Sequence, residues 1–179
     1  TVTRVTTIYL DKAGLIGKVS LSLRALPLYI LLSESIVFLI SMSLFAGFLL
    51  IIGFPITWAW LWLIPVYLVQ QLMAYSLGFG AAVLGVFIRD IVELMRITVQ
   101  LWFWLTPIVY VLTILPEETQ AMLSWNPMTH FVTAFRDVIL YAQQPDLMVL
   151  AKLLCLGLVL LGMALFGFKR LEKDMRDFI

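Results

Sequence analysis

The stretch FIRDIVELMRI, residues Phe87–Ile97, places two arginines, an aspartate and a glutamate within eight positions, between two long apolar runs. Across the chain, 63% of residues are hydrophobic and only 13% are charged, with a mean hydropathy of +1.04. A soluble domain carries about 25% charged residues. The apolar excess is more than the core of a 179-residue chain can bury, so lipid must cover the rest. The composition therefore predicts an all-α integral membrane protein.

About 20 apolar residues are needed to cross the hydrocarbon core of a membrane. Four segments of this chain come close to that length, at about 25–52, 58–86, 97–115 and 147–168. The first contains Glu34, the only acidic residue well inside a predicted span. No soluble domain fits between these segments, and residues 25–168 are therefore expected to form one transmembrane domain.

The basic residues predict the orientation, because lysine and arginine mark the cytoplasmic side of a membrane protein. Ten of the twelve lie before the first span, between the second and third, or after the fourth: Arg4, Lys12, Lys18, Arg24, Arg89, Arg96, Lys169, Arg170, Lys173 and Arg176. Both ends of this chain and the stretch 87–97 are thus expected in the cytoplasm, with residues 169–179 as a tail. The net charge of +1 gives no reason to expect nucleic acid as a partner.

The stretch 87–97 is predicted to be a cytoplasmic turn between the second and third spans. Asp90 and Glu93 are three residues apart, as in a capping box that opens a helix. Arg89 and Glu93 are four apart and can pair along a helix. A solvated, positively anchored turn accounts for these charges without any function, and docking of a partner is the alternative.

Residues 116–141 are too apolar for an ordinary loop. Pro116 can open a helix, and Asn126 and Pro127 can end it and begin another, with asparagine as the N-cap and proline at the first helical position. Neither helix is long enough to span. The pattern predicts a re-entrant helical hairpin on the extracytoplasmic side, whose polar backbone other helices shield from lipid.

Several side chains are candidates for a transport path or a gate, each with a structural alternative. Trp102, Trp104 and Tyr110 can stack on sugars, or they can face lipid or pack in the core. Glu34 can be a polar site at the dimer interface or inner opening, or a residue hydrogen-bonded to a neighbouring serine. The predicted outer gate comprises Pro116, Asn126, Pro127, His130 and Arg136, and the last two can equally cap and anchor the hairpin. One histidine and one cysteine supply no metal site or catalytic constellation.

Short motifs in residues 87–179 resemble a known family. They are Arg89-Asp90, the Thr-Pro-x-x-Tyr of Thr106–Tyr110, Leu115-Pro116, Asn126-Pro127, Arg136 and the basic tail. In this order and spacing they resemble type-2 permeases of ATP-binding-cassette (ABC) exporters, specifically those that export O-antigen, capsule or teichoic acid polysaccharides. The segment before residue 29 is similar less sharply, with Leu26-Pro27-Leu28 in place and Leu21 and Ser22 where the family has Phe-Pro.

The resemblance implies that this chain is the last four of six spans in a permease of the bacterial cytoplasmic (inner) membrane. It implies a homodimer, a lipid-linked glycan substrate and a separate ATPase that binds ATP and Mg. The chain has no G-x-x-x-x-G-K-[ST] phosphate loop, so it is not expected to be an enzyme or to hold a cofactor. Coupling to the ATPase is expected through segment 1–24 and the turn, in particular Asp11, Lys12, Lys18, Arg89, Asp90 and Glu93.

Three alternatives remain open at this point. An ABC exporter of a drug or a lipid would have the same architecture. A channel without an energy partner would need no cytoplasmic docking surface. An intramembrane glycan-handling enzyme would need a catalytic constellation at membrane depth, and the residue types for one are missing from the predicted spans.

Overall fold

The computed structural model describes residues 1–12, 14, 23, 25–108, 116, 118, 120 and 123–178, with side chains described up to 175. The regular structure in these residues is helical, which confirms the predicted all-α class. The elements are α1 (Val2–Asp11), α3 (Ala25–Ile51), the 3-10 helix η1 (Trp58–Trp62), α4 (Leu63–Phe87), α5 (Asp90–Trp104), α7 (Pro127–Leu140) and α8 (Leu147–Phe178). Three stretches are long and apolar enough to cross a membrane: Ala25–Ile51, Trp58–Phe87 and Leu147–Met175.

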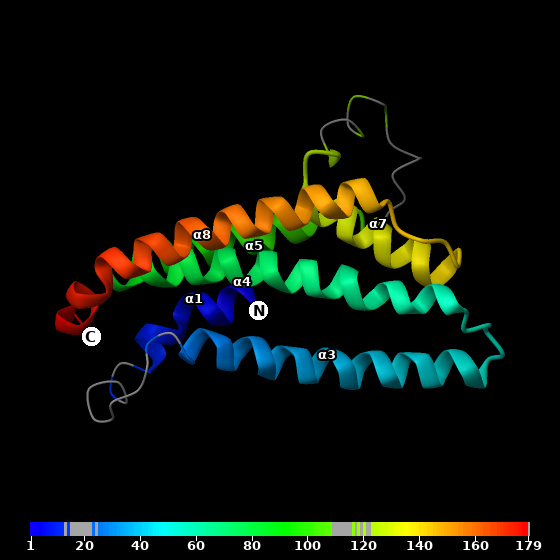
Figure 1. The fold of residues 1–179 in the computed structure, drawn as a ribbon, viewed down its shortest axis with the longest axis horizontal. Helices are drawn as coiled ribbons and strands as arrows, with labels where there is room; N and C mark the ends of the chain where they lie inside the picture. The colour runs from blue at the N-terminus through cyan, green and yellow to red at the C-terminus, as the bar shows by residue number, and fades with distance from the viewer. Residues whose placement is uncertain are drawn as a thin grey trace.

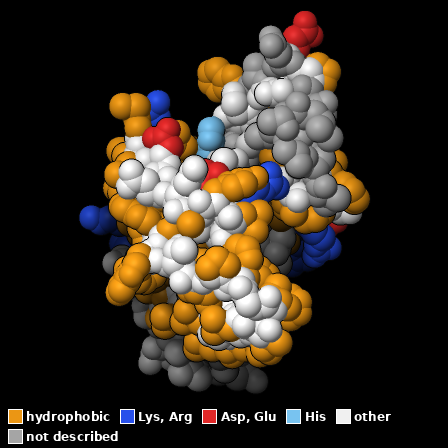
Figure 2. All heavy atoms as spheres, turned by 90° about the vertical axis from the view of Figure 1, so that its right-hand side faces the viewer, with side chains coloured by type: hydrophobic (Ala, Val, Ile, Leu, Met, Phe, Trp, Pro, Cys, Tyr) orange, Lys and Arg blue, Asp and Glu red, His pale blue; other side chains and the backbone are white. Residues whose placement is uncertain are grey.

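Helices α3, α4 and α8 lie side by side along the long axis of the molecule (Figure 1). The end of α1, the start of α3 and the end of α8 lie at one end of the bundle. Helix α7 and the start of α8 lie toward the other end (Figure 1). Apolar side chains cover much of the described surface at that second end (Figure 2). A bundle with so apolar an exterior is suited to lipid rather than water.

Helix α4 is the centre of the bundle. Its apolar stretch is 67% buried, compared with 6% for α3 and 22% for α8. Small residues let neighbouring helices approach it closely: Gly78, Gly80, Ala81, Ala82 and Gly85. On the α8 side, Ser76 Oγ donates to the carbonyl oxygen of Gly157 at 3.1 Å. The position of α4 is thus set by small side chains on several of its faces.

Helix α1 packs into the bundle against α4. Val5, Ile8 and Tyr9 are buried, and a Cβ atom on Gly78 would lie 2.9 Å from the carbonyl oxygen of Val2. Much of the predicted cytoplasmic segment 1–24 is therefore a packed helix. The coupling prediction then concerns the exposed end of α1 and residues 15–22, which lie outside the described residues.

The charged stretch 87–97 differs from the predicted turn. Only Ile88 and Arg89 separate α4 from α5, and the other charges lie in the first two turns of α5. The predicted capping box is absent, since α5 has no side-chain cap bond. The predicted pair of Arg89 and Glu93 is also wrong, because Glu93 pairs with Arg96 at 3.0 Å. An acid that precedes its basic partner suits the helix dipole better than the reverse order.

The structure describes only part of the predicted third span, whereas the predicted fourth span is present as part of α8. Helix α5 begins at Asp90 and ends at Trp104, and residues 109–115 of the predicted third span lie outside the described residues. A fourth crossing of the membrane therefore stays a prediction. Helix α8 continues without a break to Phe178, so the predicted tail is the end of the same helix.

Part of the predicted hairpin is present as helix. Helix α7 begins at Pro127, and Asn126 is its N-cap, as the sequence predicts. Before it, Gln120 N donates to Pro116 O at 3.0 Å and Ser124 N donates to Gln120 O at 2.9 Å, which are helix-like bonds. Most of residues 109–122 lie outside the described residues, and the re-entrant arrangement stays a prediction.

Candidate functional site

A groove of about 570 Å³, here called the central groove, lies between α1, α3, α4, α5 and α7. Helices α1, α3 and α4 supply its polar side chains, and α5 and α7 supply apolar ones. Its lining includes Thr1, Thr3, Glu34, Phe38, Tyr67, Gln70, Gln71, Val99, Met128 and Phe135. Polar groups inside an apolar helical bundle are rare and mark substrate pathways or binding sites.

A chain of hydrogen bonds crosses the polar wall of the central groove. Tyr67 Oη donates to Ser35 Oγ at 3.0 Å, and Gln71 Nε2 donates to Tyr67 Oη at 2.6 Å. The Tyr67 ring stacks on Phe38, with ring centroids 4.0 Å apart and an angle of 12° between the planes. Phe38 in turn lies 6.3 Å from the ring of Phe135 on α7. The groove thus combines hydroxyl and amide groups with aromatic faces, which is the chemistry that binds sugars.

Glu34 is placed in the central groove by α3, and α1 neutralises its charge. Arg4 Nη1 donates to Glu34 Oε1 in a direct ion pair. The Glu34 side chain is 22% exposed, and Arg4 is 57% exposed. An ionised acid on an apolar helix is costly without a partner, and the arginine of α1 provides one.

A second cluster of polar contacts joins α5 to α7 through Asn126. Its Oδ1 accepts from Met128 N at 2.9 Å and from Trp102 Nε1. Its Nδ2 donates to the carbonyl oxygen of Leu105 and to Thr106 Oγ1, both at 3.3 Å. The side chain therefore caps α7 and fixes the break at the end of α5 at the same time.

Two further predicted gate residues tie α7 to neighbouring backbone. Arg136 Nη2 donates to the carbonyl oxygen of Pro107 at 3.1 Å, and His130 Nε2 lies 2.8 Å from the carbonyl oxygen of Ser124. Pro127 occupies the first turn of α7. Pro116 is exposed, and its carbonyl oxygen accepts from Gln120. The structure brings Asn126, His130 and Arg136 together as anchors of α7.

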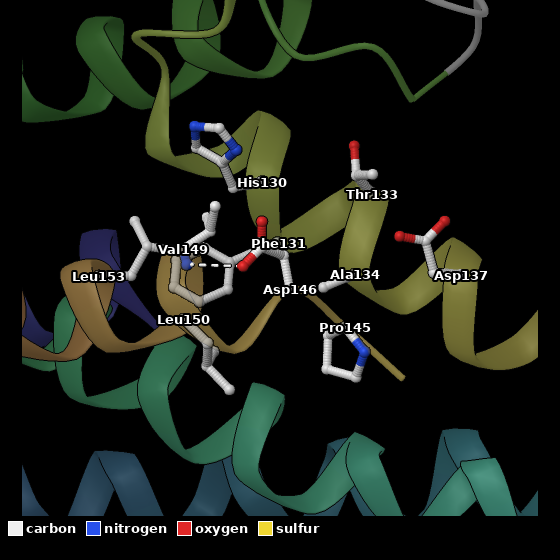
Figure 3. Close-up of a pocket in the computed structure, with 10 residues that line it drawn as sticks. All are labelled: His130, Phe131, Thr133, Ala134, Asp137, Pro145, Asp146, Val149, Leu150 and Leu153. Carbon is white, nitrogen blue, oxygen red and sulfur yellow. Dashed lines mark hydrogen bonds between the residues drawn. The ribbon is translucent and has the colours of Figure 1, made fainter. Parts of the chain in front are cut away.

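A pocket of about 200 Å³ lies between α7 and the start of α8 (Figure 3). His130, Thr133 and Asp137 extend from α7, while Asp146 Oδ1 caps α8 by accepting from Met148 N at 2.8 Å and Val149 N at 3.2 Å. Partial burial raises the pKa of Asp137, although the neighbouring Arg136 acts in the opposite direction. The pocket offers hydroxyl and carboxylate groups above an apolar floor.

The predicted transport-path residues are not all in one place. Glu34 lines the central groove. Trp102 packs with the cluster around Phe131 and Val66 and donates to Asn126. Trp104 is 69% exposed on the outside of the bundle, and Tyr110 lies outside the described residues.

The predicted coupling residues lie at the ends of two neighbouring helices. Asp11 and Lys12 are exposed at the end of α1. Arg89, Asp90 and Glu93 are exposed at the start of α5, which contacts α1. Lys18 lies outside the described residues. The described members of this set are thus all exposed, and their role in coupling stays a prediction.

Sequence reasoning missed Tyr67, Phe38 and the role of Arg4 in the central groove. The pair Gln70–Gln71 within an apolar run was the available signal, because amides at membrane depth need hydrogen-bonding partners. The bonds of Arg4 to Glu34 and of Tyr67 to Ser35 could not be predicted, because each joins two helices, 30 or more residues apart in the chain.

The comparison with protein families settles the class of protein. The model of the ABC-2 type transporter family matches residues 18–140. This chain belongs to the ABC-2 type transporter family. That result confirms the family predicted from the motifs. The matched region includes α3, α4, α5 and α7, and thus most of the lining of the central groove.

Two relatives carry names related to export. The chain is 24% identical over 131 residues to the O-antigen export system permease protein RfbA of Klebsiella pneumoniae, covering 73% of this chain and 51% of that protein. It is 26% identical over 171 residues to the protein of the same name from Myxococcus xanthus, covering 94% of this chain and 66% of that protein. The chain thus spans about half to two thirds of the length of these relatives.

Proposed function

We propose that this chain is part of the permease subunit of an ATP-driven exporter that moves a lipid-linked polysaccharide across the cytoplasmic membrane of a bacterium. The observation that carries the proposal is the central groove. It is built by five helices of an ABC-2 family chain, and it presents hydroxyl, amide and aromatic groups at the depth of the apolar helices. The names of the relatives support a glycan as the substrate class.

The energy source in this proposal is a separate ATPase. The chain itself contains no phosphate-loop motif. Membership of the ABC-2 type family supports a nucleotide-binding partner, with ATP and Mg bound there. The exposed charges at the ends of α1 and α5 are the proposed contact surface, with both ends of this chain in the cytoplasm.

The assembly proposed here is a homodimer of six-span subunits, with this chain as the last four spans. In that assembly residues 97–115 complete a third span beyond the break at Leu105, and residues 116–141 form a re-entrant hairpin at the outer side. The exposed apolar faces of α3 and α5 support burial against further helices or lipid. A second copy of the subunit is one source of such helices.

The proposal is tested with the full-length permease, purified in mild detergent from cells that make the glycan. An ATPase subunit should co-purify, and hydrolysis of ATP should rise with the lipid-linked glycan. Stimulation by drugs or simple lipids instead would favour the alternative exporters. If no ATPase subunit co-purifies, a channel without an energy partner would be favoured.

A pair of tyrosine variants tests the role of the central groove. Tyr67→Phe removes a hydroxyl that bonds to Ser35 and Gln71, so glycan export should fall by roughly two- to tenfold. Tyr29→Phe makes the same chemical change on α3, where Tyr29 is 62% exposed, and export should stay unchanged. Equal export by both variants would argue against the groove as the path.

A further inference from the structure

We infer that a second hollow, at the inner end of the central groove, binds the phosphate group of the lipid that carries the glycan. This phosphate groove, of about 210 Å³, lies between α1 and α5 and is lined by Thr3, Arg4, Thr7, Val92 and Arg96. The inference rests on the proposed function, since it names the part of the substrate that this hollow takes.

The lining has the chemistry of an anion site. Two guanidinium groups and two hydroxyl groups line a space that carries a single apolar side chain, Val92. A guanidinium carries five N–H donors in a planar fork that matches phosphate oxygens. Among the described residues, the ion pairs of Arg4 and Arg96 involve only the Nη1 atom of each. The two side chains are 57% and 62% exposed, so a ligand can reach them.

The carboxylates nearby leave room for a phosphate. Glu93 pairs with Arg96 at 3.0 Å, with both side chains about 60% exposed, and such surface pairs contribute little free energy. A phosphate or diphosphate carries more charge and more acceptor oxygens than a carboxylate, and it can replace Glu93. Glu34, the partner of Arg4, lines the central groove rather than the phosphate groove.

The two hollows are neighbours along α1 and α5 and share one lining residue. Thr3 lines both. On α5, Val92 and Arg96 line the phosphate groove, and Val99 lines the central groove. Positions 92, 96 and 99 share one face of a helix, because residues three and four apart are neighbours. A lipid phosphate held at Arg96 would therefore have its sugar chain directed toward Tyr67 and Phe38.

The depth of the phosphate groove fits a lipid headgroup. Arg96 is six residues beyond Asp90, or about 9 Å along α5 at 1.5 Å per residue. Thr7 is four residues before Asp11, or about 6 Å from the end of α1. If those helix ends lie at the membrane surface as proposed, the groove lies where headgroups meet hydrocarbon, which is about 5–8 Å below the surface.

Binding of a soluble lipid diphosphate tests the site. The full-length permease with its ATPase is placed in phosphatidylcholine nanodiscs and titrated with farnesyl diphosphate, and farnesol serves as the uncharged control. Arg96→Gln should weaken binding by roughly tenfold, as expected for loss of a charge-assisted contact. The matched control is Arg170→Gln, an exposed arginine on α8 outside the phosphate groove, and its affinity should change less than twofold.

Three results would overturn the inference. The first is unchanged affinity in Arg96→Gln, provided that its melting temperature matches the wild type. The second is an equal loss in Arg170→Gln, which would indicate a diffuse basic surface. The third is full displacement of farnesyl diphosphate by 30 mol% phosphatidylglycerol, which would assign the groove to ordinary phospholipid. Thr7→Val, which removes one hydroxyl at nearly constant shape, should give a smaller loss and provides a second variant should Arg96→Gln unfold.

The outcome can be separated from that of the proposed function. Glycan export and retention of the ATPase measure the proposed function without reference to the phosphate groove. If binding of farnesyl diphosphate does not depend on Arg96 while glycan export and retention of the ATPase are intact, the site alone is overturned. Binding that depends on Arg96 in a protein that exports no glycan overturns the proposed function and leaves the site as a lipid-phosphate site.

Discussion

The side chain of Asn126 makes both a local helix cap and a contact to another helix. Its position before Pro127 predicts an N-cap, and its side chain accepts from Met128 N as that prediction requires. The same amide also reaches Trp102 on α5 and Leu105 and Thr106 directly after it. The cap could be predicted because it involves residues two apart in sequence. The contacts to α5 could not, since they depend on how two helices pack.

Replacement of Asn126 by alanine should lower the free energy of unfolding by about 1–3 kcal/mol, because it removes a cap and leaves the Trp102 N–H without its acceptor. Chemical unfolding of the purified protein in detergent measures this. Asn126→Asp keeps the acceptor oxygen and loses only the two donor bonds, so it should cost less. Equal losses in the two variants would contradict the role of the acceptor. We also expect normal membrane insertion of Asn126→Ala with reduced export.

For Glu34, the need for a partner could be predicted from the sequence, but the identity of the partner could not. An acid inside an apolar run predicts a partner or a cavity, and the structure provides both. One of the two interpretations of the sequence gave Glu34 a neighbouring serine as its hydrogen-bonding partner. The actual partner, Arg4, comes from α1, which is too short and too mixed in composition to be recognised as part of the bundle.

At the scale of elements, the long apolar helices follow directly from composition. The predicted spans 25–52 and 58–86 match α3 and the run from η1 through α4 within a few residues. The start of α5 was missed, because four charges in FIRDIVELMRI suggested a turn. Three of those charges lie on α5, whose residues are all at least partly exposed, so no buried face marked this helix.

The packing of α1 on α4 depends on the absence of a side chain at Gly78. A Cβ atom there would lie 2.9 Å from both Val2 O and Val5 Cβ, so Gly78→Ala should push α1 outward and lower the free energy of unfolding by about 1–3 kcal/mol. Gly162→Ala on α8 is the matched control. Nothing lies within 4 Å of its Cβ position, and alanine there should gain up to about 1 kcal/mol from helix propensity. Thermal unfolding compares the two variants, and similar losses in both would contradict the tight contact.

At the scale of the whole molecule, the distribution of basic residues predicts which end faces the cytoplasm. In a Cys155→Ser background, single cysteines at Glu118 and Lys173 should react with an impermeant maleimide from opposite sides of sealed vesicles. Both native side chains are exposed, so reagent access is not limited by burial. Labelling of both cysteines from the same side would contradict the proposed four-span topology.

Coupling to the ATPase should pass through α1. Asp11 and Lys12 are exposed at its end, and Arg4, two turns earlier on the same helix, holds Glu34 in the central groove. A force applied at the end of α1 would therefore reach the groove directly.

Reversing the charges of Asp11 and Lys12 should abolish glycan-stimulated ATP hydrolysis in reconstituted complexes while the permease stays in the membrane. Neutralising Arg89 together with Glu93 should change stability by less than about 1 kcal/mol, because the ion pair of Glu93 with Arg96 that it removes is exposed. Wild-type behaviour of both variants would place the coupling surface elsewhere in the full-length protein.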